Sequence, residues 1–88
     1  MDLLSLLRPK RKAAPAKLWR NWYRAEEDFN FYEVGFKKAG EIWPSAHAWP
    51  SRDIAQTKAR LSMDLWEMAA EMSGEPVTIA YLGARQDA

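Results

Sequence analysis

Residues 51–73, SRDIAQTKARLSMDLWEMAAEMS, limit what this chain can fold into more than any other stretch does. Their large apolar side chains recur at alternating intervals of four and three residues, which places them on one face of a helix. That face carries Ile54, Lys58, Leu61, Leu65, Met68 and Met72. Lys58 is the polar exception, since a lysine stem can lie along a core while its ammonium group stays in water. We predict one long helix that packs on the core with this face.

A second, smaller stripe runs beside this face and consists mostly of small residues: Ala55, Ala59, Ser62, Trp66 and Ala69. Ser51 suits the N-cap, because its hydroxyl can accept a bond from an early helix amide. Asp53 suits the positive end of the helix dipole, and Gly74 suits the left-handed position that ends a helix. We therefore place the helix over residues 51–73.

Alternation after the helix predicts a strand over residues 77–82. Val77, Ile79 and Tyr81 form its clearly apolar face, and Gly83 ends it. A lone strand cannot satisfy its own backbone hydrogen bonds, so it requires partner strands elsewhere in the chain.

Residues 18–49 allow two interpretations. A helix is one, because apolar residues from Leu18 to Ala39 also keep a four-three spacing and Gly40 could stop it. Strands are the other, because FNFYEVGF is rich in aromatic and β-branched residues and Gly35 interrupts the helical pattern. We favour strands, since the strand at 77–82 needs partners. The predicted fold is α+β, with a small, mainly antiparallel sheet packed on the helix of residues 51–73.

Charge is divided unevenly along the chain. Residues 1–24 hold seven basic residues and one acidic residue, a net charge of +6, and residues 25–88 hold six basic and eleven acidic residues, a net charge of −5. We interpret residues 1–17 as a basic N-terminal arm and residues 18–88 as a single α+β domain. The 88-residue chain contains no cysteine and no apolar run of membrane-spanning length, so we expect a soluble, unprocessed, cytoplasmic protein.

The sequence contains no catalytic signature. It has one histidine and no serine elbow with glycine on both sides, so it lacks the parts of a nucleophilic triad. One histidine without cysteine does not make a metal cluster, and acidic residues 26–28 lack the spacing of a calcium loop. We expect no enzyme activity, no cofactor and no metal.

The tripeptide Trp-Pro-Ser occurs twice, at residues 43–45 and 49–51, with the only histidine, His47, between the copies. Proline holds the residue before it in an extended conformation. We expect the second copy to end a strand and start the helix, and the first to bend or bulge a strand. Trp43, His47 and Trp49 can form a docking surface for a partner, but we favour packing of the tryptophans against the core.

The basic arm is the best functional lead. Its cationic side chains and those just after it suit phosphates or an acidic partner, and aromatic residues are interleaved with them. They are Arg8, Lys10, Arg11, Lys12, Lys17, Arg20 and Arg24. Four leucines come first and suit a groove on a partner protein: Leu3, Leu4, Leu6 and Leu7. An inert tail, or one that folds back on the acidic helix face of its own chain or a neighbour, stays open, and a membrane surface is the least favoured partner.

The segments AGEIWPSAHAWPSRDIAQTKA and VTIAYLGA, within residues 39–83, resemble small accessory proteins of bacteriophages and prophages. The resemblance implies an α+β fold and a phage-like origin, and it transfers no catalytic or binding residue. We expect a non-enzymatic binding protein that occupies a host or viral macromolecule, for example to inhibit a host defence or regulatory complex. The alternatives are a nucleic-acid-binding accessory protein that uses the arm, and a structural virion or self-assembly component.

Overall fold

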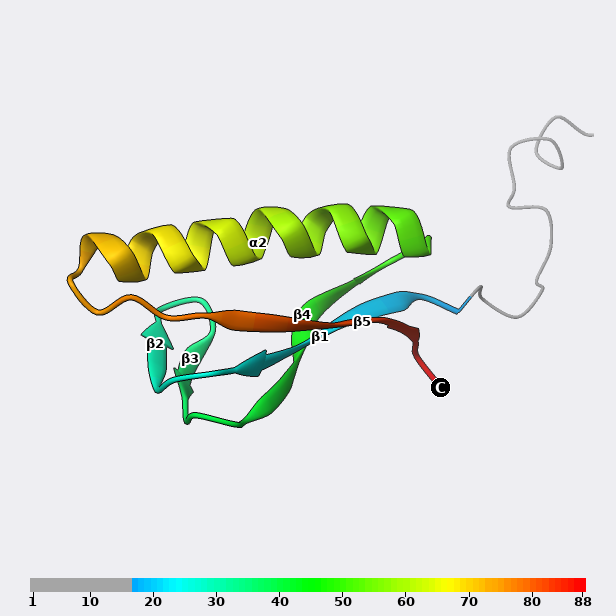
Figure 1. Ribbon diagram of the computed structural model, residues 1–88. Coiled ribbons are helices and arrows are strands. Elements are labelled where there is room, and N and C mark those ends of the chain that lie inside the picture. The colour runs from blue at the N-terminus through cyan, green and yellow to red at the C-terminus, as the bar shows by residue number, and fades with distance from the viewer. Residues whose placement is uncertain (1–16) are drawn as a thin grey trace, which may run out of the picture.

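Strand β1 lies in the middle of a three-stranded antiparallel sheet, and helix α2 lies along one face of that sheet (Figure 1). A computed structural model describes residues 17–88. In chain order the elements are β1 (Trp19–Ala25), β2 (Phe29–Phe31), β3 (Gly35–Lys37), β4 (Ile42–Trp49), α2 (Arg52–Met72) and β5 (Ile79–Gln86). β1 pairs with β4 on one side and with β5 on the other, so β4 and β5 run parallel to each other. β2 and β3 form a separate hairpin.

The predicted α+β fold is confirmed, and so are strands rather than a helix over the middle of the chain. The ends of α2 follow from local chemistry. The Ser51 hydroxyl accepts a hydrogen bond from the amide of Ile54 at 3.1 Å, as a helix N-cap does. Gly74 has a φ of 87°, a left-handed conformation that glycine adopts without strain, and it follows the last turn.

The predicted core face of α2 is wrong. The sheet covers the smaller stripe instead, and Ala55 and Ala59 are 0% and 1% exposed. The large apolar side chains of the predicted face are between 43% and 82% exposed: Ile54, Leu61, Leu65, Met68 and Met72. The sheet and hairpin already bring large aromatic rings to this side, so small residues let the helix backbone approach them closely. We call the exposed row of these five residues and Lys58 the α2 stripe.

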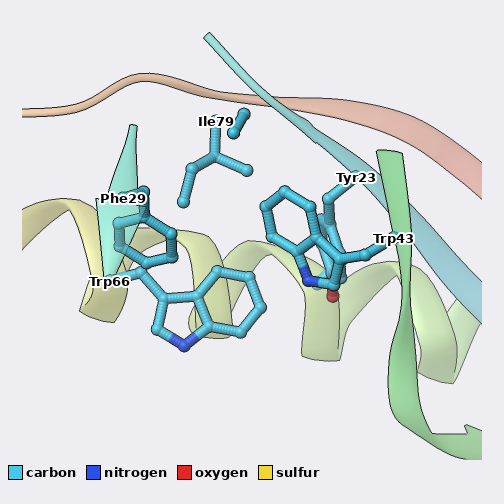
Figure 2. Packing of buried hydrophobic residues seen from close by; sticks show 7 residues of the cluster. Tyr23, Phe29, Trp43, Trp66 and Ile79 are labelled. Atoms are coloured by element: carbon cyan, nitrogen blue, oxygen red, sulfur yellow. The ribbon is translucent and has the colours of Figure 1, made fainter. Parts of the chain in front are cut away.

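Aromatic rings from both layers make up most of the core (Figure 2). Tyr23 of β1 meets Trp66 of α2 edge-on, with ring centroids 5.1 Å apart. Trp43 of β4 and Phe29 of β2 close the cluster around the same indole, at 6.1 and 6.3 Å. Burial raises the pKa of the Tyr23 hydroxyl to about 12, as expected for a phenol enclosed by apolar rings.

The last strand differs from the prediction at both ends. It begins at Ile79 rather than Val77, and it continues through Gly83 to Gln86. Gly83 has a φ of 107° and lies where the pairing with β1 shifts register, between Trp22 and Tyr23. A glycine with positive φ accommodates such a bulge inside a strand. The glycine that was expected to stop the strand therefore bends it.

Candidate functional site

A wide bulge interrupts β4 directly after Pro44. Arg20 of β1 is opposite Ala48, and Trp22 is opposite Pro44, so one residue of β1 faces three residues of β4, 45–47. The predicted bend at the first Trp-Pro-Ser is confirmed in this form. Bulges of this kind redirect side chains and often lie next to functional sites.

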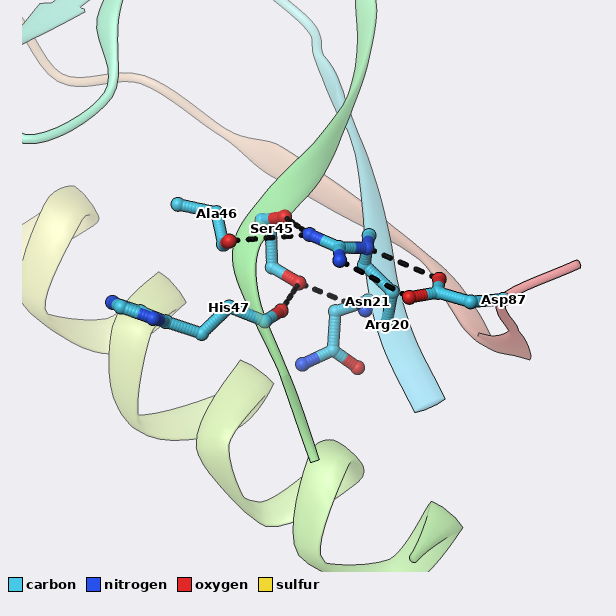
Figure 3. A network of polar contacts seen from close by, with 6 residues as sticks. All are labelled: Arg20, Asn21, Ser45, Ala46, His47 and Asp87. Carbon is cyan, nitrogen blue, oxygen red and sulfur yellow. Dashed lines mark hydrogen bonds and ion pairs between the residues drawn. The ribbon is translucent and has the colours of Figure 1, made fainter. Parts of the chain in front are cut away.

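Hydrogen bonds from β1 hold the bulge in shape (Figure 3). The Arg20 Nη1 group donates to the carbonyl oxygens of Ser45 and Ala46, at 2.8 and 3.1 Å. The backbone amide of Asn21 donates to Ser45 Oγ at 3.0 Å, and that hydroxyl donates to the carbonyl of His47 at 2.6 Å. Polar groups that the bulge takes out of the strand ladder are thus satisfied by side chains.

The same arginine ties the bulge to the end of the described chain. Arg20 Nε and Nη2 donate to the two carboxylate oxygens of Asp87, each at 3.1 Å. Such a bidentate pair fixes the plane of the guanidinium as well as its position. The hydrogen bond from Arg20 holds the pKa of the Asp87 carboxyl below its usual range.

Asn21 connects the bulge to the core layers. It is 0% exposed, its Nδ2 donates to the carbonyl oxygen of Ala55 in α2 at 2.7 Å, and its Oδ1 accepts from the Tyr81 hydroxyl at 2.8 Å. A buried amide with both ends bonded fixes the distance between sheet and helix at this point.

A cleft of about 570 Å³ opens between the bulge, the β2–β3 hairpin and α2. Its lining residues are Tyr23, Glu33, Val34, Lys37, Trp43, Pro44, Ser45, Ala46, His47, Trp49, Ser62 and Trp66. Trp43 is only 6% exposed, Trp49 is half-buried and His47 is exposed. The rings of His47 and Trp49 lie 6.5 Å apart. The predicted trio therefore lines one cavity, and Trp43 also packs in the core as expected.

The chemistry of the cleft suits an apolar or aromatic group. Three indoles, Val34, Pro44 and Ala46 line it, together with five charged or polar side chains: Glu33, Lys37, Ser45, His47 and Ser62. Lys37 lies 5.7 Å from the Trp43 ring centroid and 3.8 Å from the Glu41 carboxylate, so its charge is already compensated. Among residues 17–88, no group of three or more histidine or acidic side chains is arranged to hold a metal ion.

The α2 stripe lies beside the cleft. Ser62 belongs to the cleft wall, and residues three and four apart on a helix are neighbours, so Ser62 adjoins Lys58 and Leu65 of the stripe. The cleft and the apolar stripe thus share one side of α2.

The basic residues predicted to bind phosphates fall in different places. Arg20, Trp22 and Arg24 alternate with buried residues of β1, so they lie on the sheet face that α2 does not cover. Arg24 pairs with Glu26 at 2.8 Å, and Lys17 is exposed. The remaining arm predictions, on Leu3, Leu4, Leu6, Leu7, Arg8, Lys10, Arg11 and Lys12, lie outside the described residues.

Sequence reasoning missed two parts of the site. Asn21 gave no signal, because a single asparagine among aromatic and basic residues reads as a surface residue. Val34 lines the cleft because of where the β2–β3 hairpin lies. Ser62 lines it because α2 packs on the sheet with its row of small residues. No local sequence pattern specifies either arrangement.

No family model, curated protein or solved structure matches this chain. The resemblance to phage accessory proteins stays a prediction. Within residues 17–88, no helix combines the length and the apolar character needed to cross a membrane.

Proposed function

We propose that this protein is a non-enzymatic protein-binding module whose cleft receives an apolar or aromatic side chain of a partner protein. The observation that carries the proposal is a cleft of about 570 Å³ lined by Trp43, Trp49 and Trp66. Tight protein interfaces concentrate their binding energy where a large side chain enters a desolvated pocket, and tryptophan is enriched at such points. Occupying a host or viral macromolecule in the cytoplasm, and so inhibiting it, is the action we propose.

Two features favour a protein over a small molecule. The cleft is flanked by the α2 stripe, which extends the apolar surface well beyond the cavity. Such an extended exposed apolar surface is typical of protein interfaces. The network around Arg20 and Asn21 holds the bulge in place before a partner arrives, which lowers the ordering cost of binding.

The test is to fill the cleft and ask which partner is lost. Ser62→Trp places an indole at the cleft wall, whereas Gln56→Trp adds the same side chain at an exposed position on another side of α2. Each variant and the unchanged protein serve as bait in affinity capture from the native host. We expect a partner that the unchanged protein and Gln56→Trp retain and that Ser62→Trp loses. A partner held equally by all three baits contradicts the proposal.

A nucleic-acid-binding function is the second candidate, and one contact favours it. On the sheet face opposite α2, the Arg85 guanidinium lies 5.8 Å from the Trp22 ring centroid. An arginine beside an aromatic ring suits a stacked base and its phosphate. Affinity for a single-stranded oligonucleotide should then fall steeply with salt and be lost on deletion of residues 1–17. Affinity that salt does not change contradicts this candidate.

A further inference from the structure

The α2 stripe has the spacing of a coiled-coil seam. Its residues are separated by four, three, four, three and four positions, an average close to the repeat of about 3.5 residues that keeps a seam facing a second helix. The sheet instead contacts the adjacent row, which includes Ala55, Ala59 and Trp66. Within residues 17–88, α2 therefore presents two apolar faces, and the one with the larger aliphatic side chains has no cover.

Charge changes sign along this helix. The half before Met63 carries Arg52, Lys58 and Arg60 against Asp53, with Lys58 in the stripe itself, whereas every charged residue in the half after Met63 is acidic. These acidic residues are Asp64, Glu67 and Glu71. A helix with one basic and one acidic half complements a second copy of itself when the two run in opposite directions.

We propose that the α2 stripe pairs with the α2 stripe of a second copy, as an antiparallel helix pair related by a two-fold axis near Met63. In this arrangement Ile54 packs on the partner's Met72, and Leu61 packs on the partner's Leu65. Lys58 lies beside the partner's Met68, within reach of the partner's Glu71. The interface is isologous, so every contact occurs twice.

A parallel pair is disfavoured by the same residues. It would place Lys58 against the partner's Lys58 at one layer of the seam, and each acidic half against the other acidic half. Like charges in direct opposition destabilise a helix pair, whereas a polar residue in the seam selects the arrangement that satisfies it.

The leucines and cations of residues 1–12 are the other occupant that the sequence offers. Their positive charge suits the acidic half of α2 but repels Lys58 and Arg60 in the other half. A second α2 satisfies both halves at once, so the stripe fits a second copy better than it fits the arm. This proposal does not depend on the proposed function. A dimer formed through the stripe covers the apolar row beside the cleft, so the partner of the proposed function would then bind at the cleft alone.

The first experiment measures dimerisation of the full chain by sedimentation equilibrium. Leu61→Glu adds a charge within the stripe, and the matched control Gln56→Glu adds one at an exposed position outside it. We expect a concentration-dependent dimer for the unchanged chain and the control, and dimerisation weakened by roughly tenfold or more for Leu61→Glu, with unchanged circular dichroism. A monomer at every concentration overturns the proposal.

The second experiment tests the direction of the helices. The chain has no cysteine, so single cysteines report unambiguously. Ile54→Cys and Met72→Cys should form a disulfide when the two variants are mixed under oxidising conditions, and neither should cross-link to itself. Self-linkage of either variant alone indicates parallel helices and overturns the antiparallel pairing.

A charge exchange and a deletion complete the test. Lys58→Glu should weaken the dimer, because it places a carboxylate beside the partner's Glu71, and adding Glu71→Lys should restore it. Failure of the second change to restore the dimer contradicts the proposed contact. Deletion of residues 1–16 should leave dimerisation unchanged. If the dimer forms only after that deletion, the arm occupies the stripe and the proposal is wrong.

Discussion

Arg20 joins three segments of the chain with a single guanidinium group. It lies in the central strand, donates to two carbonyl oxygens of the β4 bulge, and pairs with Asp87 beyond β5. Its neighbours in the sequence are aromatic and basic, so the sequence indicates a phosphate contact. The structure commits its donors to the fold, because each of its three nitrogen atoms donates at least one bond within the chain.

The first prediction concerns the Arg20–Asp87 pair and pH. The pKa of Asp87 is lower in the folded chain than in the unfolded chain, so the pair contributes its full stability above about pH 4, and this contribution declines as the pH falls towards the lower pKa of the folded chain. Asp87→Asn should therefore lower the melting temperature at pH 7 and lower it less at pH 3. Thermal unfolding followed by circular dichroism at several pH values measures this. An equal loss at both pH values would show that the charge of Asp87 does not matter.

The second prediction concerns the buried amide of Asn21. Asn21→Ala leaves the Tyr81 hydroxyl and the Ala55 carbonyl without their partner, so we expect the free energy of unfolding to fall by about 2–3 kcal/mol. Asn30→Ala, at an exposed position of β2, is the matched control and should change it little. Urea unfolding gives both values, and equal effects of the two substitutions would contradict the role assigned to Asn21.

At the scale of elements, α2 has two apolar faces, of which one packs on the sheet and the other is exposed. The row of small residues that includes Ala55 and Ala59 permits close packing on aromatic rings. The α2 stripe, with its larger side chains, faces away from the sheet. A larger side chain at Ala55 or Ala59 would collide with the closely packed aromatic rings of the core. A smaller side chain in the α2 stripe would leave no internal cavity, because the stripe is exposed.

The third prediction follows from these two rows. Ala59→Leu should destabilise the fold by about 1–3 kcal/mol, because the new side chain overpacks the interface with the sheet. Leu61→Ala should change the stability of the monomer by less than about 0.5 kcal/mol. Chemical unfolding at concentrations too low for dimerisation compares the two. A larger loss of stability for Leu61→Ala than for Ala59→Leu would mean that the α2 stripe, not the row of small residues, is the core face.

The boundaries of α2 could be predicted from the sequence because Ser51 and Gly74 act on their own turns. Its buried face could not, because the choice between two adjacent stripes depends on rings that come from β1, β2 and β4. The bulge was foreseeable from Pro44, which disturbs any strand. Its depth depends on Arg20 and Asn21, which lie more than twenty residues away in the sequence. The cleft exists only once these long-range contacts form.

At the scale of the whole molecule, both halves of the chain meet on β1. Trp19 is opposite Trp49 on one side and opposite Gln86 on the other. Ile79 of β5 is buried in the core, and the amide of Ile79 donates to the Glu67 carboxylate of α2 at 2.9 Å. The last strand therefore completes the sheet, the core and the connection to the helix together.

The fourth prediction is that the chain does not fold without β5. Deletion of residues 79–88 should abolish cooperative thermal unfolding, because β1 loses its hydrogen bonds on one side and the core loses Ile79. A synthetic peptide of residues 77–88 added in trans should restore a cooperative transition. Near-ultraviolet circular dichroism follows both steps, since two tryptophans, Trp43 and Trp66, lie in the core. A native-like spectrum of the shortened chain would contradict the prediction.

The position of β1 between two later strands has a consequence for synthesis of the protein. The central strand leaves the ribosome first, yet one of its two neighbours, β5, ends at Gln86. Until that residue has left the exit tunnel, β1 exposes a row of unpaired amides and carbonyls next to aromatic side chains. Such a nascent chain can pair with other extended chains, so the interval between translation of β1 and of β5 is when it is most exposed to misassembly and most in need of a chaperone.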